Sequence, residues 1–270
     1  MFWNARNGSV PVGGTKMDYV SFGRGNRTLI LLPGLSDGLA TVRGKALLLA
    51  KPYELFFDRF TVYMFSRKEN LPEGYSIRDM AGDQAKAMAQ LGLTDACVMG
   101  VSQGGMIAQY LAIDHPALVE KLVLAVTAPY ANDLVRERVS RWAELARQGN
   151  HKQLMIDTAE TSYSPGTLKK YRRIYPVIGM IGKPRNYARF LTNIGAIFGF
   201  DASGELSRIT CPTLVIGGEE DNIVGIQASR ELVQGIPGSR LFVYPGLGHA
   251  AYEEAKDFNQ RVFTFFSEDQ

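Results

Sequence analysis

The chain has 270 residues, of which 46% are hydrophobic and 21% are charged, and its formal net charge is only +3. This balance is typical of one globular domain and excludes a disordered, fibrous or disulfide-rich chain. No run reaches the roughly 18 uncharged apolar residues of a membrane span, and the first residues lack the apolar core of a signal peptide, so we expect a cytoplasmic protein without a membrane partner.

Short apolar runs alternate with helical periodicity in the first half of the chain. This alternation favours the α/β class, with a mostly parallel central sheet flanked by helices. The runs predict strands at 16–22, 28–32, 60–65, 96–101 and 119–126, and helices at 77–91 and 103–113. Because a Gly-rich turn at 23–26 joins the first two strands, we interpret them as a hairpin.

Strand signals are missing between residues 129 and 206, where helical segments rich in Arg, Tyr and Ile take their place. The alternation resumes with a strand at 213–217, a helix at 228–234, a strand at 241–244 and a final helix at 251–266. We therefore predict a core formed by residues 1–128 and 207–270. Residues 129–206, called the cap below, are predicted to be a helical insertion over the sheet.

The positive charge is concentrated in the cap. Residues 131–200 hold twelve Lys and Arg against five Asp and Glu, a local excess of +7. No motif of interleaved basic and aromatic residues accompanies this excess, so we expect no nucleic-acid partner. We interpret the excess as a solvated helical surface, and the alternative is steering of an anionic substrate.

The two cysteines, Cys97 and Cys211, are too few for a disulfide framework and lack metal-ligand spacing. Each begins an apolar run, so we interpret both as buried, reduced thiols.

A G-x-S-x-G pattern with Ser102 at its centre lies at the junction of a predicted strand and a predicted helix. Such a junction strains the backbone of the central residue and lifts its side chain out of the sheet. Gly100 and Gly104 leave space for the neighbouring elements. The pattern predicts that Ser102 is a nucleophile.

A serine nucleophile needs a histidine base held by a carboxylate. Three histidines are present: we expect His115 to end a helix at the surface and His151 to be exposed in the cap. His249 follows an apolar strand, and the carboxyl ends of parallel strands share one edge of a sheet. We therefore predict that His249 is the base.

The acid is expected in the loop after the strand at 213–217. This position gives the chain order serine, acid, histidine. Glu219, Glu220 and Asp221 all lie there, and we favour Asp221 because the apolar residues Ile223 and Val224 that follow can anchor the loop.

Two backbone N–H groups should stabilise a developing oxyanion, one from the residue after the nucleophile and one from a loop after an early strand. Gln103 is the first candidate. Leu35 is our choice for the second, with Ser36 as the alternative, because Gly34 before them allows a close backbone approach.

These segments resemble the α/β-hydrolase superfamily over nearly the whole chain, and the core is most similar to its small esterase and enol-lactonase branch. Three positions depart from the family pattern. Pro33 stands where many members have His, Gly225 replaces a frequent proline, and residues 65–68 lack the usual Asp and Gly.

The resemblance and the residues together imply acyl transfer to water, with a small-molecule ester as substrate and neither metal nor organic cofactor required. Trp142, Tyr163 and Phe198 of the cap are the candidate substrate-binding residues, and we expect a monomer or a homodimer. Lactone, thioester or C–C bond hydrolysis on the same triad, a cofactor-free haloperoxidase side activity, and a signal-binding protein that keeps the fold are the alternatives.

Overall fold

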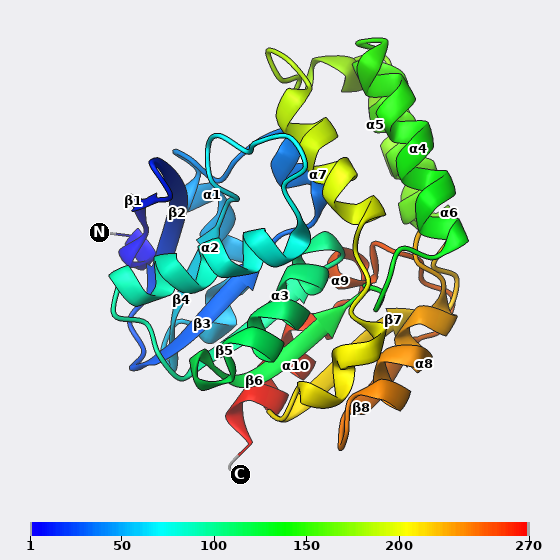
Figure 1. Cartoon of the computed structure of the whole chain (residues 1–270). Helices are drawn as coiled ribbons and strands as arrows, with labels where there is room; N and C mark the ends of the chain where they lie inside the picture. The colour runs from blue at the N-terminus through cyan, green and yellow to red at the C-terminus, as the bar shows by residue number, and fades with distance from the viewer. Residues whose placement is uncertain (1, 269–270) are drawn as a thin grey trace.

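An eight-stranded sheet forms the centre of the protein in a computed structural model that describes residues 2–268 (Figure 1). The strand order is β1-β2-β4-β3-β5-β6-β7-β8, and all neighbours from β4 onward are parallel. The expected α/β class with a mostly parallel sheet is confirmed. The strands are β1 (Arg6–Val12), β2 (Thr15–Gly23), β3 (Arg27–Leu32), β4 (Phe60–Phe65), β5 (Ala96–Val101), β6 (Val119–Ala125), β7 (Thr213–Gly218) and β8 (Arg240–Tyr244).

Helices cover both faces of the sheet, because alternate strand residues point to opposite sides. In β3, Ile30 and Leu32 belong to the apolar cluster under α2, α3 and α8, whereas Leu29 and Leu31 belong to the cluster under α1 and α10. The α-helices are α1 (Ala46–Ala50), α2 (Ile77–Gln90), α3 (Gln103–Asp114), α4 (Asp133–Arg147), α5 (His151–Ser162), α6 (Pro165–Tyr171), α7 (Ala188–Phe198), α8 (Ile226–Gly235), α9 (Ala251–Glu254) and α10 (Phe258–Ser267). Short 3₁₀ helices are η1 (Phe2–Asn4), η2 (Leu35–Gly38), η3 (Lys51–Phe56), η4 (Pro116–Leu118), η5 (Arg172–Ile174), η6 (Ile178–Met180) and η7 (Ser203–Arg208).

The predicted hairpin of β2 and β3 is wrong, because β4 lies between them. The turn at 23–26 instead packs against the segment before β4. Arg24 N donates to Phe57 O at 2.9 Å and Gly25 N donates to the same oxygen at 3.1 Å, and a Cβ on Gly25 would overlap the backbone of Arg59. The hairpin partner of β2 is β1, which the sequence analysis did not predict, joined by Gly13 and Gly14 at positive φ. Pro11 is tolerated in β1 because β1 is an edge strand.

The predicted final helix at 251–266 is also wrong, since it is two helices, α9 and α10. Ala255 adopts an extended conformation between them. The break turns the chain so that Phe258, Val262 and Phe266 of α10 are buried against the sheet.

The described part of the cap contains α4, α5, α6 and α7 and no named strand. Two segments join it to the core and pair with each other: Ala131 N donates to Phe200 O at 3.0 Å, and Ala202 N donates to Pro129 O at 2.8 Å. These hydrogen bonds fix the cap at its base.

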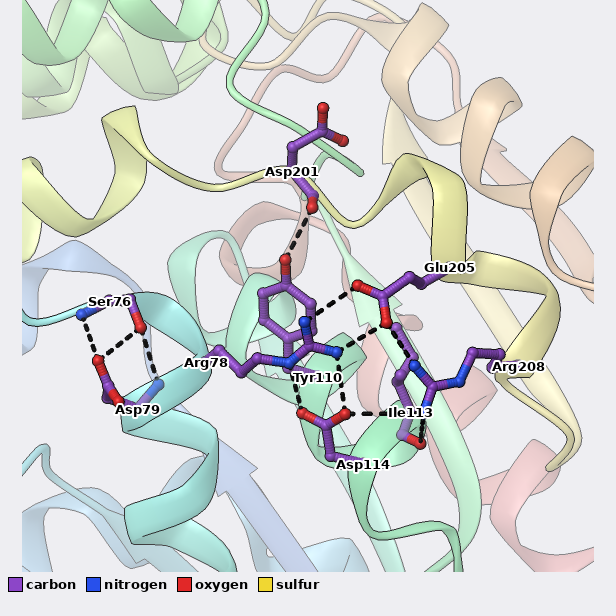
Figure 2. A network of polar contacts seen from close by, with 9 residues as sticks. All are labelled: Ser76, Arg78, Asp79, Tyr110, Ile113, Asp114, Asp201, Glu205 and Arg208. Carbon is purple, nitrogen blue, oxygen red and sulfur yellow. Dashed lines mark hydrogen bonds and ion pairs between the residues drawn. The ribbon is translucent and has the colours of Figure 1, made fainter.

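A polar network holds the chain where it leaves the cap (Figure 2). Arg78 of α2 binds Asp114 at the end of α3 and Glu205 of η7, both at 2.7 Å. The guanidinium also lies over the ring of Tyr110, whose hydroxyl donates to Asp201 O at 2.7 Å. Segments far apart in the sequence are thus tied together beside the base of the cap.

His151 is buried, contrary to the expected exposure. Asn150 caps α5 by accepting from Gln153 N, which places His151 in the first turn of the helix. Its Nε2 lies 2.8 Å from Ile181 O, and its ring lies beside Tyr187. The segment 178–187 therefore covers this histidine.

Both cysteines are free; Cys97 is buried as expected, whereas Cys211 is half-buried. Among residues 2–268, no helix is long and apolar enough to cross a membrane.

Candidate active site

Ser102 lies at the sharp turn between β5 and α3 with φ 52° and ψ −120°. This conformation is costly for a residue with a side chain. Ser102 N donates to Ala125 O at 2.9 Å, and Thr127 Oγ1 donates to Ser102 O at 2.7 Å. The end of β6 and the loop after it thus hold both backbone groups of Ser102, while its side chain is half-exposed.

The two flanking glycines are required by close packing. A Cβ on Gly100 would overlap the carbonyl group of Gly104, and a Cβ on Gly104 would overlap the carbonyl group of Leu32 in β3. Gly104 therefore lets the turn approach β3 closely, and Gly100 lets β5 approach the first turn of α3.

Gly104→Ala should therefore lower the free energy of unfolding by about 1–3 kcal/mol or more, because the overlap is with backbone rather than with a movable side chain. Urea denaturation measures this loss. Gly82→Ala in α2 is the control, since nothing lies within 4 Å of its added Cβ; it should stabilise the helix by about 0.5–1 kcal/mol. Equal stability of Gly104→Ala and the parent protein would contradict the packing argument.

The structure brings the three predicted triad residues together from three different loops. His249 Nε2 lies 3.0 Å from Ser102 Oγ, and His249 Nδ1 lies 2.8 Å from Asp221 Oδ2. His249 and Asp221 are both buried. The distances allow a proton to pass from the serine hydroxyl to an imidazole that the carboxylate orients.

Both oxygens of the Asp221 carboxylate have hydrogen-bond partners, His249 at Oδ2 and backbone N–H groups at Oδ1. Its Oδ1 accepts from Ile223 N at 2.8 Å and from Val224 N at 3.0 Å. Burial raises the pKa of Asp221, but the neighbouring His249 and the hydrogen bonds outweigh burial and hold the pKa below its usual value. The carboxyl group is therefore ionised at neutral pH.

The two competing carboxylates point elsewhere. Glu219 and Glu220 are exposed, and Glu219 Oε2 accepts from Gly246 N at 3.3 Å. Neither has a hydrogen bond to His249 among the contacts of the described residues.

The predicted oxyanion loop lies against the serine. A Cβ built on Gly34 would be 3.4 Å from Ser102 Cβ. Leu35 is the first residue of η2 and Gln103 the first residue of α3. N–H groups at the first position of a helix have no intrahelical acceptor, so both can donate to a substrate oxygen. Ser36, the alternative to Leu35, is exposed on η2.

A charged cluster that we did not predict from the sequence joins these two donors. Asp37 of η2 accepts from Arg189 Nη2 at 2.6 Å and lies 3.8 Å from Arg67 Nη1. Arg67 Nη2 donates to Gln103 Oε1 at 2.9 Å, and Gln103 Nε2 donates to Asn193 O at 2.9 Å. The cluster therefore connects the oxyanion loop, the start of α3 and the cap helix α7.

Burial lowers the pKa of Arg67 to about 10; Asp37 opposes this shift, and Arg189 adds to it. Arg67 is still charged at neutral pH, so Asp37 faces two cations. The unusual 65–68 segment was visible in the sequence, but no sequence signal indicated its partners in η2 and α7.

Asp37→Asn should lower the free energy of unfolding by about 3–5 kcal/mol, because it leaves the buried guanidinium group of Arg67 and the half-buried one of Arg189 without their anion. Urea denaturation measures the loss. The matched control is Asp58→Asn, since the Arg24–Asp58 pair is 3.4 Å long with both side chains at least 80% exposed. This control should leave stability almost unchanged, and an equal loss in both variants would contradict the prediction.

The three candidate substrate-binding residues have varied surroundings. Trp142 is buried in the cap and donates from Nε1 to Asp157 Oδ1 at 2.8 Å. Tyr163 follows α5, and its hydroxyl donates to Glu253 of α9 at 2.5 Å. Phe198 is half-buried at the end of α7. Their role in substrate binding stays a prediction.

The end of α5 contacts the histidine loop directly. Ala250 N donates to Ser162 O at 2.9 Å, and a Cβ on Gly248 would lie 2.9 Å from the same oxygen. The cap thus meets the core beside His249. Among residues 2–268, no cluster of three His, Cys, Asp or Glu side chains is suited to hold a metal ion.

Known proteins resemble this chain in sequence and in fold. The family model described as alpha/beta hydrolase fold matches residues 28–256. A 2-hydroxy-6-oxononadienedioate/2-hydroxy-6-oxononatrienedioate hydrolase of a Pseudomonas species is 28% identical, with 70% of each chain covered. RutD of Klebsiella pneumoniae, provisionally named a carbamate hydrolase, is 30% identical over 70% of this chain and 72% of its own.

A solved enol-lactonase from Burkholderia xenovorans has the same fold. Its TM-score is 0.81 at 24% identity, and the match covers 97% of this chain and 100% of that one.

Proposed function

Because the chain belongs to the α/β-hydrolase family, we propose that it is a serine hydrolase that cleaves a small carboxylic ester through an acyl-enzyme. The observation that carries the proposal is the continuous contact from Ser102 Oγ through His249 to Asp221, at 3.0 and 2.8 Å. The names of the relatives support hydrolysis as the reaction class.

The first half of the reaction forms the acyl-enzyme. Ser102 Oγ attacks the carbonyl carbon, and His249 Nε2 accepts the hydroxyl proton. The backbone N–H groups of Leu35 and Gln103 donate to the oxyanion that forms. The tetrahedral intermediate then expels the alcohol, which takes its proton from His249.

The second half releases the acid. Water attacks the acyl carbon while His249 accepts a proton from it, and the same two N–H groups hold the second oxyanion. Collapse of this intermediate breaks the bond to Ser102 Oγ, which recovers its proton from the imidazolium. Asp221, ionised throughout, orients the ring and stabilises its positive charge.

The cap is proposed to set the choice of substrate, since inserted elements carry specificity on a rigid core. It reaches the reaction centre at two places: α7 through Asn193 and Arg189, and the end of α5 through Ser162. Phe198 of α7 is the aromatic candidate for a pocket wall. Lactones, thioesters, carbamates and C–C bonds would use the same nucleophile and remain alternatives to esters.

A fluorophosphonate should label the protein, and the labelled protein should lose all hydrolytic activity. A panel of aryl esters of increasing acyl length, lactones, thioesters and a β-diketone should then give the highest kcat/KM for short esters. Phe198→Ala should change the preferred acyl length, with about 10–200-fold discrimination for a methylene group, and leave the labelling rate unchanged. Absence of labelling would contradict the proposed function, and faster turnover of another class would replace the ester.

A further inference from the structure

One surface of the cap exposes aliphatic side chains to solvent. Residues 169–185, called the cap-tip patch, run from α6 through η5 and η6 toward α7. Within eight residues, four large apolar side chains have exposed fractions between 40% and 81%: Ile174, Val177, Met180 and Ile181. Solvent-exposed apolar side chains that cluster in this way mark an interaction surface.

The segment that carries these side chains is strongly cationic. Residues 161–200 contain seven Lys and Arg and no Asp or Glu. Arg172 is bound to Glu160 and Arg189 to Asp37. In the part of the chain that the structure describes, the other five are exposed and form no ion pair: Lys169, Lys170, Arg173, Lys183 and Arg185.

Buried side chains and hydrogen bonds hold the segment that carries the patch in place. Leu168 and Ile178 are buried and hold the segment against the cap. Tyr175 Oη donates to Glu160 Oε1 at 2.8 Å, and Ile181 O lies 2.8 Å from His151 Nε2. In Figure 1 α6 lies at the end of the cap nearer the core, and the yellow-green segment that leads into α7 lies at the remote end, so the patch extends along the cap to its tip. Because these contacts hold the backbone of the segment against the cap, its remaining apolar and cationic side chains are exposed to solvent.

We propose that the cap-tip patch docks onto an anionic lipid bilayer. Lys and Arg side chains are attracted to the anionic headgroups, while Met180 and Ile181 enter the boundary between headgroups and acyl chains. From the sequence we expect a solvated surface without a membrane partner, because the sequence does not show which apolar residues of this segment are exposed.

Two other partners fit the patch less well. A second copy of the chain would bring unpaired cations against the same cations. Single-stranded nucleic acid is bound by exposed aromatic rings, but Tyr171 is stacked on Tyr163 at 4.4 Å and the Tyr175 hydroxyl is bonded to Glu160. A lipid surface uses both the charge and the aliphatic groups.

Flotation of the full chain with lipid vesicles tests the proposal. The protein should float with mixed phosphatidylcholine–phosphatidylglycerol vesicles at low salt and stay in solution with phosphatidylcholine alone. Added salt should weaken binding because it screens exposed charges. Failure to float with the anionic vesicles would overturn the proposal.

Matched variants locate the surface. Lys170→Glu/Arg173→Glu should lower vesicle partitioning by roughly tenfold or more, and Met180→Ser/Ile181→Ser should lower it severalfold at unchanged melting temperature. Lys86→Glu/Arg230→Glu in the core helices makes the same change of net charge, and Leu47→Ser/Leu48→Ser removes exposed apolar groups elsewhere. Both controls should bind like the parent. An equal loss in either control, or full binding after Met180→Ser/Ile181→Ser, would overturn the proposal.

Discussion

Ser102→Ala should lower kcat by about 10⁶-fold, the scale found when the nucleophile of an intact triad is removed. Without Oγ, His249 has no hydroxyl to deprotonate and no acyl-enzyme can form, so the oxyanion donors alone remain. Turnover of an aryl ester measures the loss, and fluorophosphonate labelling followed by mass spectrometry should find no adduct.

The matched control is Ser76→Ala. Ser76 Oγ accepts from Asp79 N at 3.0 Å and caps α2, so its loss should cost about 1 kcal/mol of stability and leave kcat unchanged. The melting temperature of Ser102→Ala should stay near that of the parent protein, because the backbone contacts of Ser102 do not use its side chain. An adduct on Ser36 or Ser76 would refute the assignment of the nucleophile.

Asp221→Asn should lower kcat by about 10⁴-fold, as in the best-studied triad. An amide at this position can donate to His249 Nδ1, which favours the tautomer with its proton on Nε2. That nitrogen can then no longer accept the proton of Ser102 Oγ at 3.0 Å. The amide also removes the negative charge that stabilises the imidazolium. Steady-state kinetics on the same ester measures the change.

Glu219→Gln and Glu220→Gln are the controls for the acid, because both side chains are exposed in the same loop. Each should retain nearly full activity. If Glu220→Gln were the variant that loses activity, the contact between Asp221 and His249 at 2.8 Å would not be the catalytic one.

The elements with the strongest local signals were predicted within a few residues. The runs at 60–65 and 96–101 coincide with β4 and β5, and the helix expected at 103–113 is α3, which ends at Asp114. Buried parallel strands and an uninterrupted, almost fully buried helix are encoded in their own residues. The β1 strand was missed because its sequence, Arg6–Val12, contains Gly and Pro and belongs to an edge.

By itself, the sequence determined the positions of Ser102, Asp221 and His249 along the chain, because each follows a strand signal and parallel strands end at one edge of the sheet. Only the tertiary structure decided that β4 separates β2 from β3, since pairing order depends on packing between distant segments.

The tertiary structure also decided which charges and apolar groups are hidden. The buried Asp37 and Arg67 form one cluster with the half-buried Arg189, and His151 is covered by the segment that carries Ile181. The local sequence predicts neither set of contacts, because these residues are buried by elements that lie from 30 to more than 150 residues away along the chain. The sequence thus specified the chemical groups of the site, and long-range packing determined their environment.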